Sequence, residues 1–569
     1  MVDIIYFFLI SVLIMMSVLG YGYLFIKIAN FKIEKFNLGL VGFLGLFFLS
    51  IIASYSHILM PHGYMHNIII IITGVLSLYF FSKKFDSNIT SNLKYLILIL
   101  SLLFISLLIS KTNEDFPYYH LPNSLQFAEQ KLQFGLGNLN HGFKHISSIF
   151  MLMSINYLPY FEYYLFNLTN FIFFVFLIYF IIYEIYINKE VNHNISRIFI
   201  SLILILFLTK FSRLAEYGSD ISAQIIIAIY LYFILEILFN NSLNSKESGQ
   251  YLKLSIIFII FASTLKFILV IYSIFLIMIL FQIKKEFFRQ IIKFNYLVLT
   301  IPAIIFYIFF NFASTGCLLY PVEKTCLNDH FKWALSNEIV EYMNLHYETW
   351  AKGGKGPNFN VSEPAKYIES LNWVGNWINV YFKNKVSDFI LVTFVIILIF
   401  SLFFYKEIFS NIKNIRNLKN KFIYFYLITI ITFLLWFLNF PTLRYAGYII
   451  VYLLLIFPFV VIYDKYIDTK TVSFLQKVSV IFLICYSVFL YKNFIRLNYE
   501  LSILENQNHN FTNFPYYWID NVKFEEKFIN NIKVYSTDGM CWNIPSTCIR
   551  GIQYINLEKK NNYIFYYRK

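Results

Sequence analysis

The chain has 569 residues, of which 59% are hydrophobic and only 14% are charged. An ordinary soluble domain carries about 25% charged residues, so this composition excludes a water-soluble globular protein. The net charge of +14 does not indicate nucleic-acid binding, because the Lys and Arg residues are dispersed between apolar runs. We therefore expect membrane lipids as partners and no nucleic acid.

Apolar segments recur along the chain with lengths near the roughly 20 residues that a helix needs to cross a bilayer. The first exceeds the apolar region of a signal peptide, and no cleavage site follows it, so we interpret it as a retained span. The pattern predicts an all-α polytopic transmembrane bundle of about fourteen helices. In chain order these are 4–28, 38–60, 66–82, 93–110, 163–187, 197–209, 219–240, 252–266, 267–283, 293–311, 387–405, 421–439, 443–463 and 473–491.

The charges of the connecting loops predict the topology. If the N-terminus lies outside, the basic loops, of which 406–421 is the densest, all face the cytoplasm, as the positive-inside rule requires. This arrangement requires 146–160 to be an interfacial helix rather than a span. It places the polar segments 111–162, 312–386 and 492–569, and with them both termini, outside.

Four of the five cysteines occur as two close pairs in these outer segments, Cys317 with Cys326 and Cys541 with Cys548. Because an extracytoplasmic compartment is oxidising, we expect two local disulfides. Zinc binding is the alternative, although no His lies beside either pair at finger-like spacing. Around the second pair, 531–535 and 563–567 have the pattern of strands, which predicts a small disulfide-stapled α+β cap.

The first outer segment begins directly after a span with Glu114 and Asp115, and His120 follows. A carboxylate at the membrane surface can act as a general base, and partial desolvation brings its pKa closer to the working pH. The alternative is that acidic residues commonly flank spans on the outside.

A second outer loop contains Lys210, Arg213, Glu216 and Asp220. Cations are scarce in short outer loops, so this set predicts a cup for a phosphate, or for a metal with phosphate. A self-satisfied ion-pair cluster is the alternative. No metal motif is present, so we expect neither a metal nor another cofactor, although a divalent ion is compatible with these residues.

Two more cations, Lys266 and Arg444, lie at predicted helix ends on the same side. A charge at the hydrocarbon boundary costs about 2.5 to 3.5 kcal/mol on insertion scales, so it usually has a partner. Lys266 can instead extend its ammonium to the interface. Arg444 follows Pro441, which opens the helix, and this favours an anionic ligand there.

The remaining polar and aromatic residues of the outer face have less specific interpretations. Trp333 and Trp350 can stack on sugar rings or form an interfacial aromatic belt, and the belt is the more common arrangement. His57, His62 and His66 surround an outer turn, where we expect polar residues at headgroup level rather than a metal site.

Several of these motifs together resemble an uncharacterised family of bacterial multispanning envelope proteins, from about residue 90 onward. They are Asp115 with Tyr119-His120, the loop 216–220, the turn 316–321 with Trp333, the junction 441–444 and the tail 541–548. That family is similar to the GT-C glycosyltransferases, in which an acidic residue in an outer loop is the catalytic base and polyprenyl-phosphate sugars are donors. Here three additional spans precede that loop, and the acidic dipeptide is in reversed order.

The resemblance implies three regions: additional N-terminal helices over 1–92, a GT-C-like core over 93–491 and an extracytoplasmic cap over 492–569. It implies that Asp115 is the catalytic residue, with Glu114 as a substitute. It further implies that Asp220 and Glu216 form a second acidic loop and that Arg444 contacts the donor phosphate.

Together with these residues, the resemblance implies a glycosyltransferase of the bacterial inner (plasma) membrane that uses a polyprenyl-phosphate sugar lipid and an envelope acceptor. Asp115 would deprotonate the acceptor while Arg213 and Arg444 hold the leaving phosphate. A polymerase or ligase with the same donor is a close variant. A transporter or flippase of lipid-linked precursors is the alternative from another class, and a structural assembly subunit is the third.

Overall fold

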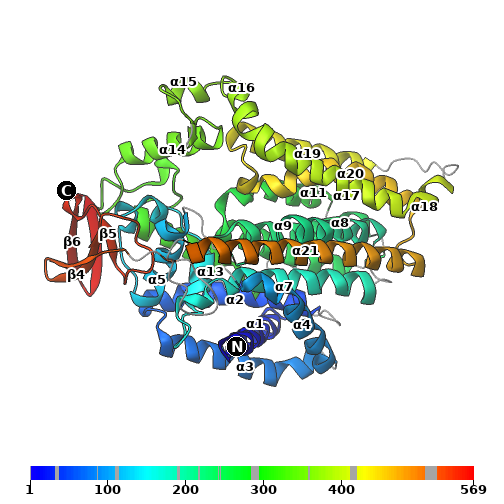
Figure 1. Cartoon of the computed structure of the whole chain (residues 1–569), viewed down its shortest axis with the longest axis horizontal. Helices are drawn as coiled ribbons and strands as arrows, with labels where there is room; N and C mark the ends of the chain where they lie inside the picture. Colours follow the sequence, from blue (N-terminus) through cyan, green and yellow to red (C-terminus); the bar gives the residue numbers. More distant parts are fainter. Residues whose placement is uncertain are drawn as a thin grey trace.

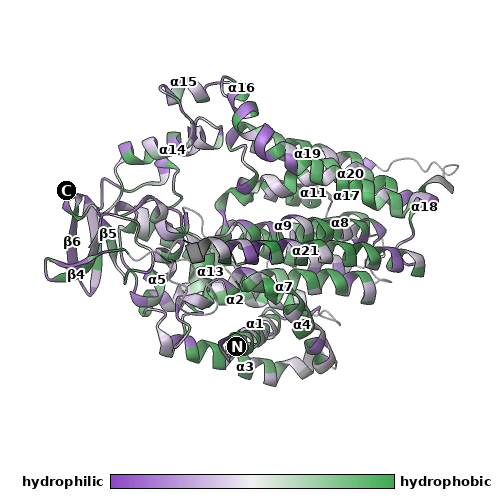
Figure 2. Cartoon of the chain, in the orientation of Figure 1, coloured by the Kyte–Doolittle hydropathy of each residue, from purple (hydrophilic) through white to green (hydrophobic). Residues whose placement is uncertain are grey.

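The computed structural model describes residues 2–31, 37–85, 88–108, 115–188, 193–215, 218–240, 242–243, 245–282, 294–356, 359–410, 420–506, 519 and 522–568. These residues form a mostly helical molecule, in which many long helices run alongside one another and a small β structure lies at one end (Figure 1). Hydrophobic residues dominate the helices, whereas hydrophilic residues gather around the β structure (Figure 2).

Within the described residues, 12 helices are long and apolar enough to cross a membrane, as judged by length and composition. They contain α1 (Val2–Ala29), α2 (Leu38–Leu59), α3 (Tyr64–Phe85), α4 (Ile89–Leu103), α7 (Leu168–Ile182), α9 (Asp220–Phe239), α10 (Ser245–Leu265), α13 (Phe294–Thr315), α17 (Ser387–Phe403), α19 (Asn420–Asn439), α20 (Tyr448–Tyr466) and α21 (Val472–Asn506). Helices α7 and α9 are almost wholly buried, while α19 and α21 expose most of their apolar side chains. Exposed apolar faces of this kind are what lipid-facing helices present.

The predicted count of fourteen spans is therefore too high by this criterion. The two segments that do not qualify are α8 (Asn194–Lys210), which has 17 residues, and 267–283, which forms the 3₁₀ helix η7 (Phe267–Ser273) followed by the short α11 (Ile274–Gln282). Helix α10 ends where the backbone of Lys266 turns to an extended conformation, so the chain cannot continue as one long helix. The predicted boundary between 252–266 and 267–283 lies at this interruption, but the second segment is too short and irregular to count as a span.

The outer segments of the sequence lie at one end of the bundle, the end that carries the β structure (Figure 1). They contain η2 (Phe116–His120), α5 (Leu121–Glu129), η3 (Leu136–Asn138), η4 (His141–Lys144), α6 (Ser148–Ser154), η5 (Tyr163–Leu165), η8 (Glu323–Thr325), α14 (Asn337–Ala351), β1 (Lys355–Gly356), β2 (Phe359–Asn360), α15 (Pro364–Ile368), α16 (Val374–Trp377) and η9 (Ile378–Val386). The remaining short helices are η1 (Phe104–Leu107), η6 (Tyr183–Ile187), α18 (Tyr405–Ser410), η10 (Leu443–Gly447) and η11 (Ile552–Tyr554).

The predicted interfacial helix 146–160 is shorter and deeper than expected. Its only regular element is α6, whose 7 residues are all buried. Ser147 begins α6 by accepting a hydrogen bond from the amide of Ile149, and its own hydroxyl donates to the carbonyl of Leu265. Because α6 is far too short to cross a bilayer, it does not invert the order of the later helices.

The C-terminal region is a small β structure, and the predicted strands are confirmed. Its strands are β3 (Glu525–Ile529), β4 (Ile532–Thr537), β5 (Cys548–Arg550), β6 (Ile555–Lys560) and β7 (Tyr563–Arg568). Strand β4 pairs antiparallel with β3 and parallel with β5, while β6 and β7 form a hairpin. We refer to residues 522–568 as the cap.

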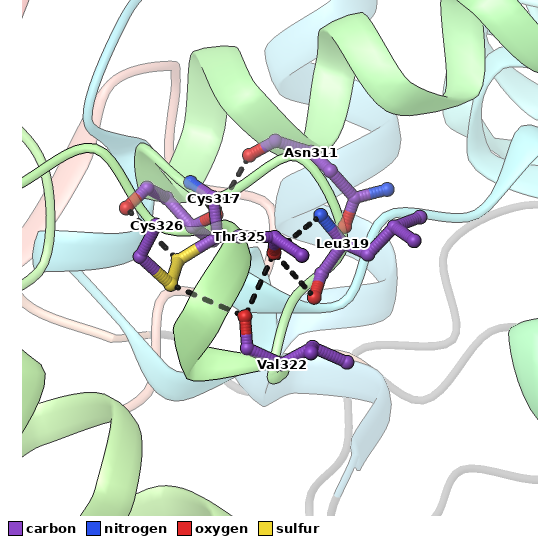
Figure 3. The surroundings of a disulfide bond; sticks show 7 residues. Asn311, Cys317, Leu319, Val322, Thr325 and Cys326 are labelled. Atoms are coloured by element: carbon purple, nitrogen blue, oxygen red, sulfur yellow. Dashed lines mark hydrogen bonds between the residues drawn. A yellow bond between two sulfur atoms is a disulfide. The ribbon is translucent and has the colours of Figure 1, made fainter.

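Both predicted disulfides are present. The bond between Cys317 and Cys326 closes a loop that Thr325 organises from inside, where its hydroxyl donates to Val322 O and accepts from Leu319 N (Figure 3). The loop packs Tyr320 against Tyr347 of α14, and the two hydroxyls are 3.1 Å apart. The disulfide thus fixes α14 to the end of α13.

Candidate functional site

Four charged side chains from separate parts of the sequence meet at one end of the long helices. Asp115 precedes η2, Asp220 is the first residue of α9, Lys266 joins α10 to η7, and Arg444 belongs to η10. We refer to these four residues as the charged cluster. Each lies where a helix begins or is interrupted, which allows charged groups to leave the apolar interior.

Arg444 is the centre of the charged cluster. Its Nη2 is 3.1 Å from Asp115 Oδ2, and its Nε is 3.8 Å from Asp220 Oδ2. Lys266 forms an ion pair with the other oxygen of Asp220 and donates a second hydrogen bond to the carbonyl of Arg444, at 2.9 Å. The sequence predicted partners for these cations, and the structure shows that they pair with carboxylates of two other segments.

The backbone around Arg444 is held in an irregular conformation between α19 and α20. Ala446 has a φ of 68°, in the left-handed region, and the hydroxyl of Tyr272 donates to its carbonyl. The indoles of Trp377 and Trp436 donate to the carbonyls of Pro441 and Thr442. These contacts satisfy the backbone where the helix is broken, so the position of Arg444 is defined by buried neighbours.

Two aromatic rings flank the guanidinium of Arg444. Its Cζ is 5.3 Å from the ring of Trp350 and 5.6 Å from the ring of Tyr445, and the two rings are 5.6 Å apart. The ammonium of Lys266 lies 4.7 Å from the ring of Tyr445. Cation–π contacts therefore hold both cations without neutralising them.

The charged cluster is accessible to a ligand. The side chains of Asp115, Arg444 and Asp220 are 32%, 36% and 42% exposed, and that of Lys266 is 15% exposed. An ion-pair cluster that served only to satisfy itself within an apolar bundle would be expected to exclude solvent. Partial exposure leaves coordination positions on Arg444 and Asp115 for an incoming anion or hydroxyl group.

His120 lies beside the charged cluster in a buried position. Burial lowers its pKa to about 4, although the charges of Asp115 and Asp220 oppose that shift. Gly218, whose φ is 106°, faces the ring, and a Cβ at this position would lie 3.0 Å from His120 Cε1. With this pKa the His120 ring is neutral at pH 7. No described residue forms a hydrogen bond with its Nδ1.

Of the other predicted site residues, the structure describes Lys210 and Arg213. Lys210 lies 6.0 Å from the ring of Phe389, and the charges near it are those of Asp388, Lys492 and Lys385. Arg213 is exposed in the segment after α8. Lys210, at the end of α8, therefore faces α17 and does not belong to the charged cluster with Asp220. Glu114 and Glu216 lie outside the described residues.

The structure adds a group of rings that the sequence interpretation did not single out. His141 and His145 of the first outer segment face His346 and Tyr347 of α14, with centroid distances of 5.9 Å for His141–His346 and 4.7 Å for His145–Tyr347. The spacing of His141 and His145 was a possible signal, but nothing in the sequence connects them with α14. Among the residues that the structure describes, no group of His, Cys, Asp or Glu is arranged to hold a metal ion.

The family model described as "Domain of unknown function (DUF8201)" matches residues 4–451, so the chain belongs to this family. The match includes the whole charged cluster and the histidines of α14 and the first outer segment, and it ends before the cap. No curated protein and no solved structure matches the chain.

Proposed function

We propose that this member of the DUF8201 family is a glycosyltransferase of the bacterial plasma membrane. It would transfer a sugar from a polyprenyl-phosphate carrier to a cell-envelope acceptor on the extracytoplasmic face. The main support is the pairing of Asp115 with Arg444 in a partly exposed cluster, at the end of the bundle where the outer segments gather. This arrangement provides a base and two cations within one site.

In the proposed reaction, Asp115 accepts the proton of the acceptor hydroxyl while the oxygen of that hydroxyl attacks C1 of the donor sugar. The new C1–O bond forms while the bond from C1 to the phosphate oxygen breaks, and the polyprenyl phosphate leaves with the electron pair. Arg444 and Lys266 would stabilise the negative charge that develops on this leaving group. Lys266 replaces Arg213 in the role that the sequence interpretation had assigned.

The ion pair between Asp115 and Arg444 supports a defined order of binding. Without substrate, the Asp115 carboxylate occupies a position on Arg444 that an anionic ligand can take. A donor phosphate that replaces it would free Asp115 to accept a proton from the acceptor. Asp220 would stay paired with Lys266 and keep both cations in place.

The experiment is a transfer assay on the purified full chain with lipid-linked donors and envelope acceptors. Asp115→Asn keeps the shape of the side chain and removes the base, so we expect transfer to fall by about 10² to 10⁴-fold. Asp388→Asn is the matched control, because Asp388 is an exposed carboxylate at the start of α17. Normal transfer by a well-folded Asp115→Asn protein would exclude the proposed base.

The same assay separates this proposal from a flippase. A flippase would move a labelled lipid-linked sugar across proteoliposomes without forming a new glycosidic bond, and Asp115→Asn would leave no transfer defect to observe. Movement of the lipid together with the absence of any transfer product would therefore replace the transferase proposal.

A further inference from the structure

The loop that carries His141 and Lys144 is fixed directly to the turn that carries Asp115. Asn140 donates from Nδ2 to the carbonyl of Tyr118, and its Oδ1 accepts from the amide of Gly142, both at 2.7 Å. Gly142 lies so close to Tyr119 that a Cβ would be 2.0 Å from the Tyr119 side chain. The position of η4 relative to Asp115 is therefore rigidly defined.

The rings of η4 and α14 form a compact group on this side of Asp115. His141 lies 5.4 Å from His145 and 5.2 Å from Tyr347, measured between ring centroids. The Nε2 atom of His141 is buried and forms no hydrogen bond with any described residue. A buried polar atom without a partner is costly, and a ligand group can satisfy it.

Lys144 places a buried cation next to these histidines. The residue is 3% exposed, and within the described part of the chain its ammonium forms neither a hydrogen bond nor an ion pair. Burial, together with the charge of Arg568, lowers its pKa to about 8, so the amine is still mainly protonated at neutral pH. A charge on a nearly buried side chain normally has a partner of opposite sign, and no described residue supplies one to Lys144.

The three histidines are in an electropositive environment. Burial lowers the pKa of His141 to about 4, and the charge of Lys144 acts in the same direction. The His145 side chain is exposed, and desolvation by its neighbours together with the charges of His141 and Lys144 lowers its pKa. Burial and the charges of Lys355 and Lys144 also lower the pKa of His346. Neutral imidazoles beside a cation can donate hydrogen bonds to an anionic oxygen.

We infer that Lys144, His141, His145 and His346 form a second subsite, which binds a carboxylate or phosphate group on the acceptor. This inference rests on the proposed function of the charged cluster, because it assigns a binding site to the acceptor, the second substrate of that reaction. The donor phosphate binds at Arg444 and Lys266, and the anionic group of the acceptor binds at Lys144 and the histidines. The charge of Asp115 acts on His141, and the charges of Lys266 and Arg444 act on His145, so the two subsites are near each other and near the proposed base.

The test measures anion binding independently of catalysis, by calorimetry on the purified full chain at low ionic strength. The probes are glucuronate for the carboxylate and glycerol 1-phosphate for the phosphate, with glucose as the neutral control. All measurements use the Arg444→Met background, which disables the donor subsite. We expect one of the two anions to bind saturably with a dissociation constant of about 1 mM or below, and glucose not to bind.

Substitutions in the subsite should weaken this binding. Adding Lys144→Met or His346→Gln to the background should weaken it about tenfold or more, since each removes a hydrogen bond to a charged group. His346 is only half-buried, so that variant keeps the fold if Lys144→Met does not. Lys366→Met is the matched control, because Lys366 is 77% exposed and pairs with Glu363.

Two results would overturn the inference: no saturable binding of either anion in the Arg444→Met background, or equal binding with and without the Lys144 and His346 substitutions. Failure of the transferase proposal looks different. In that case the anion binds and responds to the subsite substitutions, while the wild-type protein transfers no sugar.

Discussion

Two arginines of this protein occupy opposite kinds of site. Arg197 on α8 is fully buried, and it donates to Thr469 Oγ1 at 2.9 Å and to the carbonyls of Ile185 and Thr469. Arg444 on η10 is 36% exposed and pairs with carboxylates and aromatic rings. The buried hydrogen bonds of Arg197 to carbonyl oxygens join three segments of the chain. The ionic partners of Arg444 are partly exposed, so a ligand can replace them. The comparison separates a charge that stabilises the fold from one that is suited to binding.

The largest effect that would test this comparison is expected at Arg197. Replacing it with Met leaves two buried carbonyls without this donor, and we expect a loss of about 1 to 3 kcal/mol for each carbonyl in the free energy of unfolding. The measurement is thermal unfolding of the purified protein. Lys383→Met, at an exposed lysine of η9, should leave the unfolding temperature unchanged. A stable Arg197→Met protein would contradict the structural role.

At Arg444 we expect a large effect on transfer activity and a small effect on stability. Arg444→Met should lower transfer by about 10² to 10³-fold, because one donor to the developing phosphate charge is lost. Its unfolding temperature should change much less than that of Arg197→Met, since partly exposed ion pairs contribute only about 0 to 1 kcal/mol. Normal transfer kinetics with strongly reduced stability would make the two arginines equivalent and remove the distinction.

A smaller effect should come from His120 on acidification. Its pKa is lowered from 6.5 to about 4 by burial, so the unfolded chain takes up a proton first as the pH falls. Stability should therefore decrease between about pH 6.5 and pH 4, with a contribution from this residue of about 2 kcal/mol by pH 5. Unfolding measured at pH 7 and pH 5 should show a weaker pH dependence in His120→Gln. His330→Gln, at an exposed histidine, should retain the full dependence.

The sequence was sufficient for the coarse fold and for part of the charged cluster. Composition and apolar run length predict a helical bundle, and the spacing of Cys541 and Cys548 between two strand patterns predicts the cap. Asp115, Asp220, Lys266 and Arg444 were expected on one face because each is a charge at the end of an apolar run. Run ends are visible in a sequence, since charged groups must leave the hydrocarbon region.

What the sequence could not provide is the direction in which a helix end points. Lys210 and Lys266 both follow apolar runs on the same predicted side, yet only Lys266 reaches Asp220. Hydropathy also does not distinguish a buried helix from a lipid-facing one, so α8 was predicted as a span although its Arg197 is enclosed by protein. The approach of His346 to His141 depends on how α14 is folded back by the loop 317–326, which is a long-range packing effect.

The attachment of the cap has a consequence for biogenesis. Gln130 donates to the carbonyl of Ser546 across 416 positions, and Trp542 donates its amide to Pro117, two residues after Asp115. During synthesis, the segment that carries the proposed base therefore leaves the ribosome long before its partners in the cap are made. Chains interrupted before the cap would present an unfinished outer surface, which gives a protease or chaperone a physical difference by which to recognise incomplete molecules.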